Sequence, residues 1–276
     1  MSEISAASVM ALRKKTGLPM MDCKSALAEA EGNEDKAVEI LRKRGLQLNA
    51  KRSDRETSFG RFGLYIGLNK PAGAMVELQC ESAPVTSNEE FIALANDLAR
   101  AYAENGSVRT ADELLALPSK VVAGKTLGEV KDDLFNRIRE VFNIGRMARI
   151  DGATGGYSHN SGTVAGVLLG VTGGTDELAK DVAMHVAAMR PSALSVEDLP
   201  ADAVAKEREI LKAAALAEGK PEAIVEKMVE GRLRNFYAER VLLEQPFVKD
   251  DKQSVGKYAK SQGMTVTKFV HWELGR

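Results

Sequence analysis

The feature that most constrains the fold is a strand–turn–strand–helix pattern that occurs twice along the chain. In the first copy, an apolar segment at 63–68 and an alternating segment at 74–80 flank the turn-forming run 69–73, and an amphipathic helix follows at 88–105. The second copy, over 157–189, has two short strands around a Ser-Gly turn and then a helix. Because a helix of this kind covers the apolar face of a hairpin, we predict an α+β fold of two similar halves, with small antiparallel sheets flanked by helices.

The first 45 residues have a different pattern, with three short apolar stripes at helical spacing. Gly17 and Pro19 separate the first stripe from the second, and a Gly-Asn pair separates the second from the third. Asn33 is a good N-cap because the acidic residues Glu34 and Asp35 follow it. Helices this short do not persist alone in water, so we predict a small three-helix module.

Several more elements complete the predicted halves. Two helices at 201–216 and 221–237, separated by a Gly-Lys-Pro break, predict an antiparallel helical hairpin. The remaining predicted elements are a helix at 126–142, a strand at 144–150, a helix at 254–262 and a strand at 265–274.

Residues 42–58 carry six Lys or Arg residues against Asp54 and Glu56. The helical apolar periodicity fades after Leu48, so we interpret this stretch as a basic linker. A solvated helix end with a tether is favoured over a phosphate-binding arm, and both interpretations stay open.

The charge balance and the composition exclude several classes of protein. Across 276 residues, 38 Lys and Arg nearly cancel 39 Asp and Glu, and aromatic residues are 5%. We expect no direct nucleic-acid partner, because phosphate binding needs excess positive charge and base stacking needs aromatic side chains. No apolar run reaches the roughly 18 residues of a membrane span, so we expect no membrane partner. The two cysteines, Cys23 and Cys80, favour a reduced, cytoplasmic protein over a disulfide framework.

Residues that could carry covalent chemistry are few and scattered. His185 lies on an otherwise apolar helix face, which favours a buried or interface histidine over a catalytic one. Glycine runs at 152–156 and 170–174 lack the Gly-Lys-Ser/Thr ending of a phosphate loop, so we interpret them as hairpin turns. Cys23 has no histidine nearby and is interpreted as a packed thiol. We therefore expect no catalytic residue, no metal and no cofactor.

The run Leu18-Pro19-Met20-Met21 lies at a predicted turn. Flexible methionine side chains suit protein-binding surfaces, and they also fill small helical cores. The spacing alone leaves both interpretations open.

This run belongs to the most specific motif of the chain. The segment 16–27 resembles the bacterial translation elongation factor Ts family, whose motif reads Thr-Gly, two variable residues, then Met-Met-Asp-Cys-Lys-x-Ala-Leu. Every fixed position matches. Other matches follow in the family's order, at Met184-His185-Val186-Ala187-Ala188, Gly219-Lys220-Pro221, Glu226-Lys227-Met228-Val229-Glu230-Gly231-Arg232, Gln245-Pro246-Phe247-Val248 and Ser254-Val255-Gly256. The resemblance covers essentially the whole chain.

The resemblance implies a guanine-nucleotide exchange factor that is not an enzyme of bond chemistry. Such factors bind the GDP-bound and nucleotide-free forms of elongation factor Tu in the cytoplasm, release GDP and let GTP enter. The implied domains are an N-terminal helical module at 1–50, similar to ubiquitin-associated domains, a first core half at 51–150, and a second core half at 151–276 that includes a projecting hairpin at about 201–237. The implied partner-binding residues are Arg13, Met20, Met21, Asp22, Cys23, Lys24 and His185.

The chain departs from the family at one implied functional loop. The family has Cys-Glu-Thr-Asp-Phe-Val after the second strand, and its Asp-Phe pair intrudes beside the magnesium site of the partner. Here the run is Cys80-Glu81-Ser82-Ala83-Pro84-Val85, so the carboxylate and the aromatic ring are both missing. The loop at 82–85 is therefore expected either to intrude with Pro84 as a smaller wedge or to disturb magnesium only indirectly.

Two other functions remain as alternatives. A small-molecule enzyme that uses the glycine-rich hairpins would have a deep pocket lined by titratable groups. An accessory protein that binds RNA through the basic linker would lose affinity steeply as salt rises.

Overall fold

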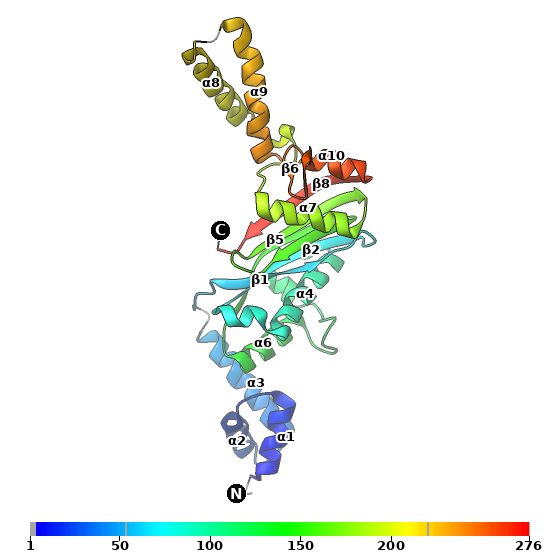
Figure 1. Cartoon of the computed structure of the whole chain (residues 1–276). Helices are drawn as coiled ribbons and strands as arrows, with labels where there is room; N and C mark the ends of the chain where they lie inside the picture. The colour runs from blue at the N-terminus through cyan, green and yellow to red at the C-terminus, as the bar shows by residue number, and fades with distance from the viewer. Residues whose placement is uncertain (1–3, 53, 220, 276) are drawn as a thin grey trace. The chain divides into compact units, whose positions relative to one another are not determined.

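The computed structural model describes residues 4–52, 54–219 and 221–275, which form helices and small sheets (Figure 1). The contacts divide the chain into two compact units. The first holds the chain up to Tyr65, then Val76–Met147 and the end from Leu274, and the second holds Ile66–Met75 and Ala148–Glu273. The predicted α+β fold of small sheets flanked by helices is confirmed. The boundaries 1–50, 51–150 and 151–276 stay a prediction.

Three helices begin the first unit, as predicted: α1 (Ala6–Thr16), α2 (Met20–Glu29) and α3 (Glu34–Ala50). The Ser5 side chain caps α1, Gly17 ends it in the left-handed region at φ 70°, and Asn33 caps α3 by accepting from the Lys36 N–H. The apolar stripes meet in one small core of buried residues, namely Val9, Leu12, Leu18, Cys23, Ala26, Leu27, Ala30, Ala37 and Leu41.

Residues 42–50 are not a linker, because α3 continues to Ala50, which agrees with the favoured interpretation of a helix end followed by a tether. The helical face is present but hard to recognise, since its positions are Leu41, Gly45 and Leu48 and the middle one has no side chain. Gly45 lies against Asn136, where a Cβ atom would be 1.8 Å from Oδ1, and Leu48 packs on the larger core of this unit. The last turns of α3 are therefore a packed helix.

A three-stranded sheet in the order β1-β2-β3 follows. Its strands are β1 (Phe59–Tyr65), β2 (Ala72–Cys80) and β3 (Phe142–Asp151), and its helices are α4 (Glu89–Glu104), the short α5 (Ala111–Leu115) and α6 (Leu127–Ile138). Helix α4 packs on β1 and α6 packs on α4 (Figure 1). Asn88 caps α4 as predicted by accepting from two backbone N–H groups. Phe91, Leu94, Leu98 and Phe142 lie at the centre of the core.

The second unit contains the antiparallel sheet β4-β5-β8, formed by β4 (Thr154–His159), β5 (Ala165–Gly173) and β8 (Met264–Glu273). Helix α7 (Asp176–Met189) is capped by Thr175 and covers β4 and β5. The predicted hairpin is α8 (Ala201–Ala217) and α9 (Glu222–Arg240), which lie side by side (Figure 1). The remaining elements are the 3-10 turn η2 (Val196–Asp198), β6 (Pro246–Phe247), β7 (Asp250–Ser254) and α10 (Val255–Ser261).

Smaller differences from the sequence analysis have local causes. Helix α6 ends at Ile138, four residues early, because Arg139 adopts the left-handed conformation at φ 67°. Helix α5 is too short to show periodicity, although Thr110 and Glu113 form a capping box around its start. The glycine run 152–156 is a turn only at Gly152, where φ is 88°; Gly155 and Gly156 lie in β4 instead. A Cβ atom at Gly155 would be 2.4 Å from that of Ala179 on α7, so this glycine allows the helix to approach the sheet.

Candidate partner-binding surface

The segment Met20–Lys24 forms the first turn of α2 and presents two methionines to solvent. Met20 is 42% exposed and Met21 is 72% exposed, whereas Leu18 belongs to the core of the three helices. Lys24 is exposed as well, and so is Arg13 in the last turn of α1. Cys23 faces the opposite way, is fully buried and is a packed thiol, as its sequence context predicts. The exposed part of this turn is therefore apolar, with a cation beside it.

Asp22 differs from its neighbours because it has a partner within the first unit. Its carboxylate is ion-paired with the guanidinium of Arg139, the residue that ends α6. Both side chains keep part of their surface in solvent, at 41% for Asp22 and 33% for Arg139. The pair therefore links the turn that carries the methionines to the end of α6.

The loop after β2 forms the 3-10 turn η1 (Ala83–Ser87). Ala83 and Pro84 are exposed, while Val85 is buried in the core. The Ser82 N–H donates to Glu140 Oε2 at 3.0 Å, and the Ser82 hydroxyl donates to the other oxygen of the same carboxylate. Thr86 Oγ1 donates to the Ala83 carbonyl at 2.7 Å. These hydrogen bonds therefore hold the loop in a turn whose exposed tip, Ala83-Pro84, is small and apolar.

Glu81, which precedes this loop, makes two further hydrogen bonds that hold the loop in place. One carboxylate oxygen accepts from the Val141 N–H at 2.8 Å and the other from Arg55 at 2.9 Å. Burial alone would raise the pKa of Glu81, but these hydrogen bonds and the nearby arginines bring it below its ordinary value. Burial raises the pKa of the neighbouring Cys80 thiol to about 12, so this cysteine is an unreactive packed group.

His185 lies in the second unit and is fully buried on α7. The Val248 N–H donates to its Nδ1 at 3.3 Å, so Nε2 carries the proton and donates to Gln245 Oε1 at 3.0 Å. Its ring packs against Phe247 with centroids 5.8 Å apart. Burial lowers its pKa, which keeps the ring neutral at pH 7. Two motifs far apart in the sequence, Met184–Ala188 and Gln245–Val248, therefore meet at this histidine.

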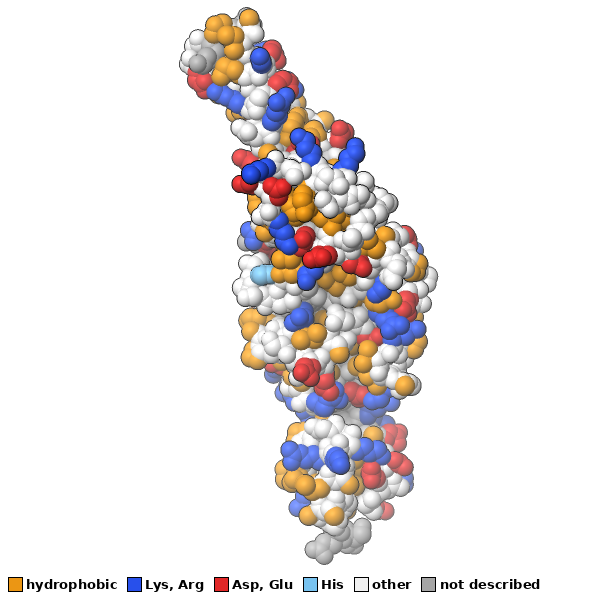
Figure 2. Space-filling model, turned by 45° about the vertical axis from the view of Figure 1, so that its right-hand side comes forward, with side chains coloured by type: hydrophobic (Ala, Val, Ile, Leu, Met, Phe, Trp, Pro, Cys, Tyr) orange, Lys and Arg blue, Asp and Glu red, His pale blue; other side chains and the backbone are white. Residues whose placement is uncertain are grey.

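The basic residues of 42–55 are mostly engaged within the first unit. Arg42 pairs with Glu129, Arg44 with Glu29 and Lys43 with Glu39. Arg55 pairs with Glu81, and the Arg52 guanidinium donates to the Arg139 carbonyl at 2.7 Å. On the face drawn in Figure 2, acidic and basic side chains are mixed and form no continuous basic stripe. This arrangement disfavours the phosphate-binding arm.

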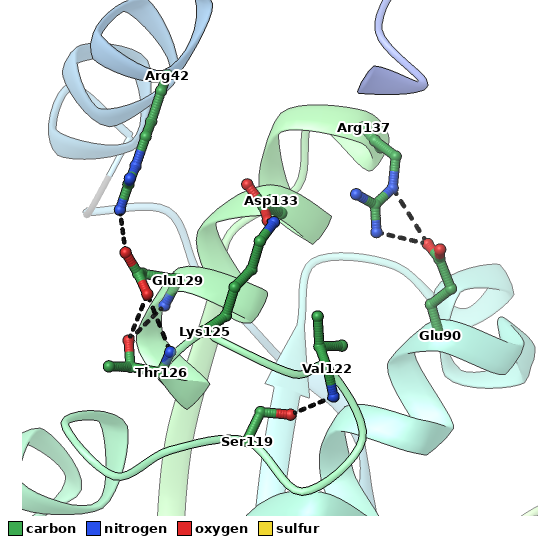
Figure 3. Close-up of polar contacts among 9 residues, drawn as sticks. All are labelled: Arg42, Glu90, Ser119, Val122, Lys125, Thr126, Glu129, Asp133 and Arg137. Carbon is green, nitrogen blue, oxygen red and sulfur yellow. Dashed lines mark hydrogen bonds and ion pairs between the residues drawn. The ribbon is translucent and has the colours of Figure 1, made fainter. Parts of the chain in front are cut away.

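A groove of about 340 Å³ opens where α3 approaches α6. Two ion pairs lie within it, Arg42 with Glu129 and Lys125 with Asp133, and Arg137 at its rim pairs with Glu90 (Figure 3). Lys15, which also lines the groove, pairs with Glu34 outside it. Within the described ranges, no three His, Cys, Asp or Glu side chains are grouped so that they could hold a metal ion. No helix among the described residues is long and apolar enough to cross a membrane.

Sequence reasoning missed the residues that hold the candidate surface in place. Arg139 and Glu140 are ordinary charged residues at a helix end, and nothing local in the sequence connects them to residues 22 or 82. Glu81 was visible in the Cys-Glu motif, but its two bonds depend on tertiary contacts.

Comparison with known proteins shows the family to which the chain belongs. A family model described as elongation factor TS matches residues 83–276. The elongation factor Ts of Methylococcus capsulatus is 43% identical over 275 residues, covering 99% of this chain and 92% of that protein. The elongation factor Ts of Saccharopolyspora erythraea is 42% identical and covers both chains fully, and that of Deinococcus radiodurans is 42% identical, covering 97% of this chain and 98% of its own. The chain is therefore a member of the elongation factor Ts family and has a role in translation elongation.

Proposed function

We propose that the chain is a guanine-nucleotide exchange factor for elongation factor Tu, which binds the GDP-bound form, promotes GDP release and lets GTP enter. The observation that carries the proposal is the identity of about 42% to proteins named elongation factor Ts, along essentially the whole chain. The protein acts in the cytoplasm by binding alone, without bond chemistry, a cofactor or direct contact with nucleic acid.

The physical basis is reciprocal coupling between two ligands of Tu. A factor that binds nucleotide-free Tu more tightly than Tu–GDP must weaken the affinity of Tu for GDP by the same factor. No particular side chain is required, provided that the contacts differ between the two states of the partner. Contacts spread over several elements of the factor can supply that difference.

We assign the first contact to the N-terminal module. The exposed Met20 and Met21, with Lys24 on the same helix and Arg13 in the last turn of α1, offer an adaptable apolar patch and two exposed cations. Cys23 supports this turn from below.

The second contact is the loop at 82–85. Its apolar tip, Ala83-Pro84, carries no charge, so the loop makes a minor contact with Tu and disturbs the magnesium site only indirectly. Proline fixes its own φ, and the bonds of Ser82 to Glu140 hold the base of the loop, so little ordering entropy is lost on binding.

The third contact is centred on His185. Because the ring is buried, we propose that it acts through the segment whose backbone it binds. That segment includes Val248, which is 50% exposed.

Release of a fluorescent GDP analogue from the cognate Tu tests the proposal. Substoichiometric amounts of the chain should accelerate release many-fold in the presence of excess unlabelled GDP. An unchanged release rate at saturating concentrations of the chain would contradict the function.

A further inference from the structure

Three residues between α6 and β3, Arg139–Val141, make contacts in two directions. We call them the corner segment. Toward the N-terminal helices, it binds Asp22; toward the loop after β2, it binds Glu81 and Ser82. These are the two elements of the first unit that the proposed function assigns to the partner.

The conformation of Arg139 sends its side chain toward α2. The residue is left-handed at φ 67°, and its N–H closes α6 by donating to the Phe135 carbonyl. Its guanidinium pairs with Asp22, and its carbonyl accepts from Arg52 at 2.7 Å. A non-glycine residue in this region is strained, so the surrounding contacts hold the backbone in place.

Glu140 and Val141 hold the loop from the other side. Both Glu140 carboxylate oxygens accept from Ser82, one from its N–H and one from its hydroxyl. The next N–H along the chain, that of Val141, donates to Glu81. The corner segment therefore contacts both the Met20–Lys24 turn and the loop at 82–85.

We propose that Arg139 and Glu140 are positioning residues, which hold the Met20–Lys24 turn and the 82–85 loop in the mutual arrangement that one partner molecule requires. This inference rests on the proposed function. Neither residue needs to touch the partner. Each reduces the conformational freedom that two separate binding elements would otherwise lose on association.

The geometry predicts separate kinetic effects for the two residues. The ion pair between Asp22 and Arg139 is partly exposed and therefore contributes little to stability. Loss of this ion pair should mainly change the placement of the Met20–Lys24 turn. Arg139→Gly should raise the half-saturating concentration of the factor about fivefold, with the maximal exchange rate within about twofold of wild type. Glu140→Ala frees the loop and should lower the maximal rate about threefold, and Glu140→Gln should keep most of it, because one amide oxygen still accepts from Ser82.

Arg190→Gly is a matched control. Arg190 also ends a helix in the left-handed conformation, at φ 51°, and is paired with a carboxylate, that of Glu273. The substitution therefore makes the same backbone change at a helix end in the second unit, where the paired carboxylate is buried instead of partly exposed. It should leave the half-saturating concentration unchanged at temperatures where the variant is folded.

The experiment combines exchange kinetics with a measurement made without Tu. Spin labels at Lys24→Cys and Ala83→Cys report the distribution of distances between the two elements, since the native Cys23 and Cys80 are fully buried. We expect a narrow distribution in the otherwise wild-type chain and a broad one with Arg139→Gly. Asp22→Asn should raise the half-saturating concentration as Arg139→Gly does, and the double variant should be no worse than either single one.

The outcomes that would overturn the positioning role differ from the outcome that would overturn the exchange function. An unchanged distance distribution in Arg139→Gly, additive effects in the double variant, or equal loss in Arg190→Gly would overturn the positioning role. If the distribution broadens while wild type does not release GDP, the positioning stands and the exchange function fails.

Discussion

Replacement of His185 by Ala separates a structural role from a direct partner contact. The substitution removes a ring that is fully buried, leaves Gln245 Oε1 without its donor and leaves the Val248 N–H without its acceptor. Two such hydrogen bonds are worth about 2 kcal/mol, and the space left beside Phe247 adds about 1–2 kcal/mol, so we expect the free energy of unfolding to fall by about 3–4 kcal/mol. The melting temperature should drop by about 10 °C.

The assay compares thermal unfolding with GDP release measured well below the melting temperature. At that temperature, His185→Ala should keep its exchange rate within about threefold of wild type, because an energetic contact residue would cost about 2 kcal/mol or more in binding. His159→Ala is the control, since His159 is partly exposed on β4 and bonds the Tyr157 hydroxyl at 3.0 Å. A variant with normal stability and exchange reduced more than tenfold would refute the buried role.

Three further predictions follow from the contacts of the other elements. Deleting residues 1–50 should leave a folded core that binds Tu poorly. Its melting temperature should be lower by a few degrees, because the packing of Leu48 and the hydrogen bond from Asn49 to Asp132 are lost. Full exchange activity would show that the main contact with Tu lies elsewhere. Pro84→Gly should reduce GDP release only modestly at all magnesium concentrations, and loss of exchange at high magnesium alone would reveal a magnesium-displacing wedge. Burial lowers the folded-state pKa of His185 and His271, so the free energy of unfolding should be highest above pH 6.5. Below pH 6.5 it should fall by up to about 1.4 kcal/mol per pH unit for each histidine, until the folded-state pKa is reached. Equal urea midpoints at pH 7.5 and 5.5 would contradict this.

The elements with strong local signals were predictable from the sequence. Helix α4 has Asn88 at its cap and a clear apolar stripe, and α7 has Thr175 and a following proline, so both were located to within a residue or two. The helical hairpin was found from its Gly-Lys-Pro break. In these cases, local propensity and tertiary packing favour the same structure.

The packing of the end of α3 was not predictable, because it depends on a partner that lies far away in the sequence. Gly45 contributes no side chain to the buried face, and only the structure shows that Asn136 fills the space beside it. The corner segment was invisible for the same reason: Arg139 and Glu140 acquire their importance from residues 22 and 82. The exposed methionines could be proposed from the sequence, but only the structure distinguishes Met21, at the surface, from Leu18, in the core.

The most direct test of the account is the affinity of the chain for Tu in two states. Isothermal titration of the chain into nucleotide-free Tu and into Tu–GDP gives two dissociation constants, and their ratio must equal the factor by which the chain weakens GDP binding. The account predicts much tighter binding to nucleotide-free Tu. Equal affinity for the two states, or tighter binding to Tu–GDP, would contradict it, because a ligand without differential affinity cannot promote nucleotide release.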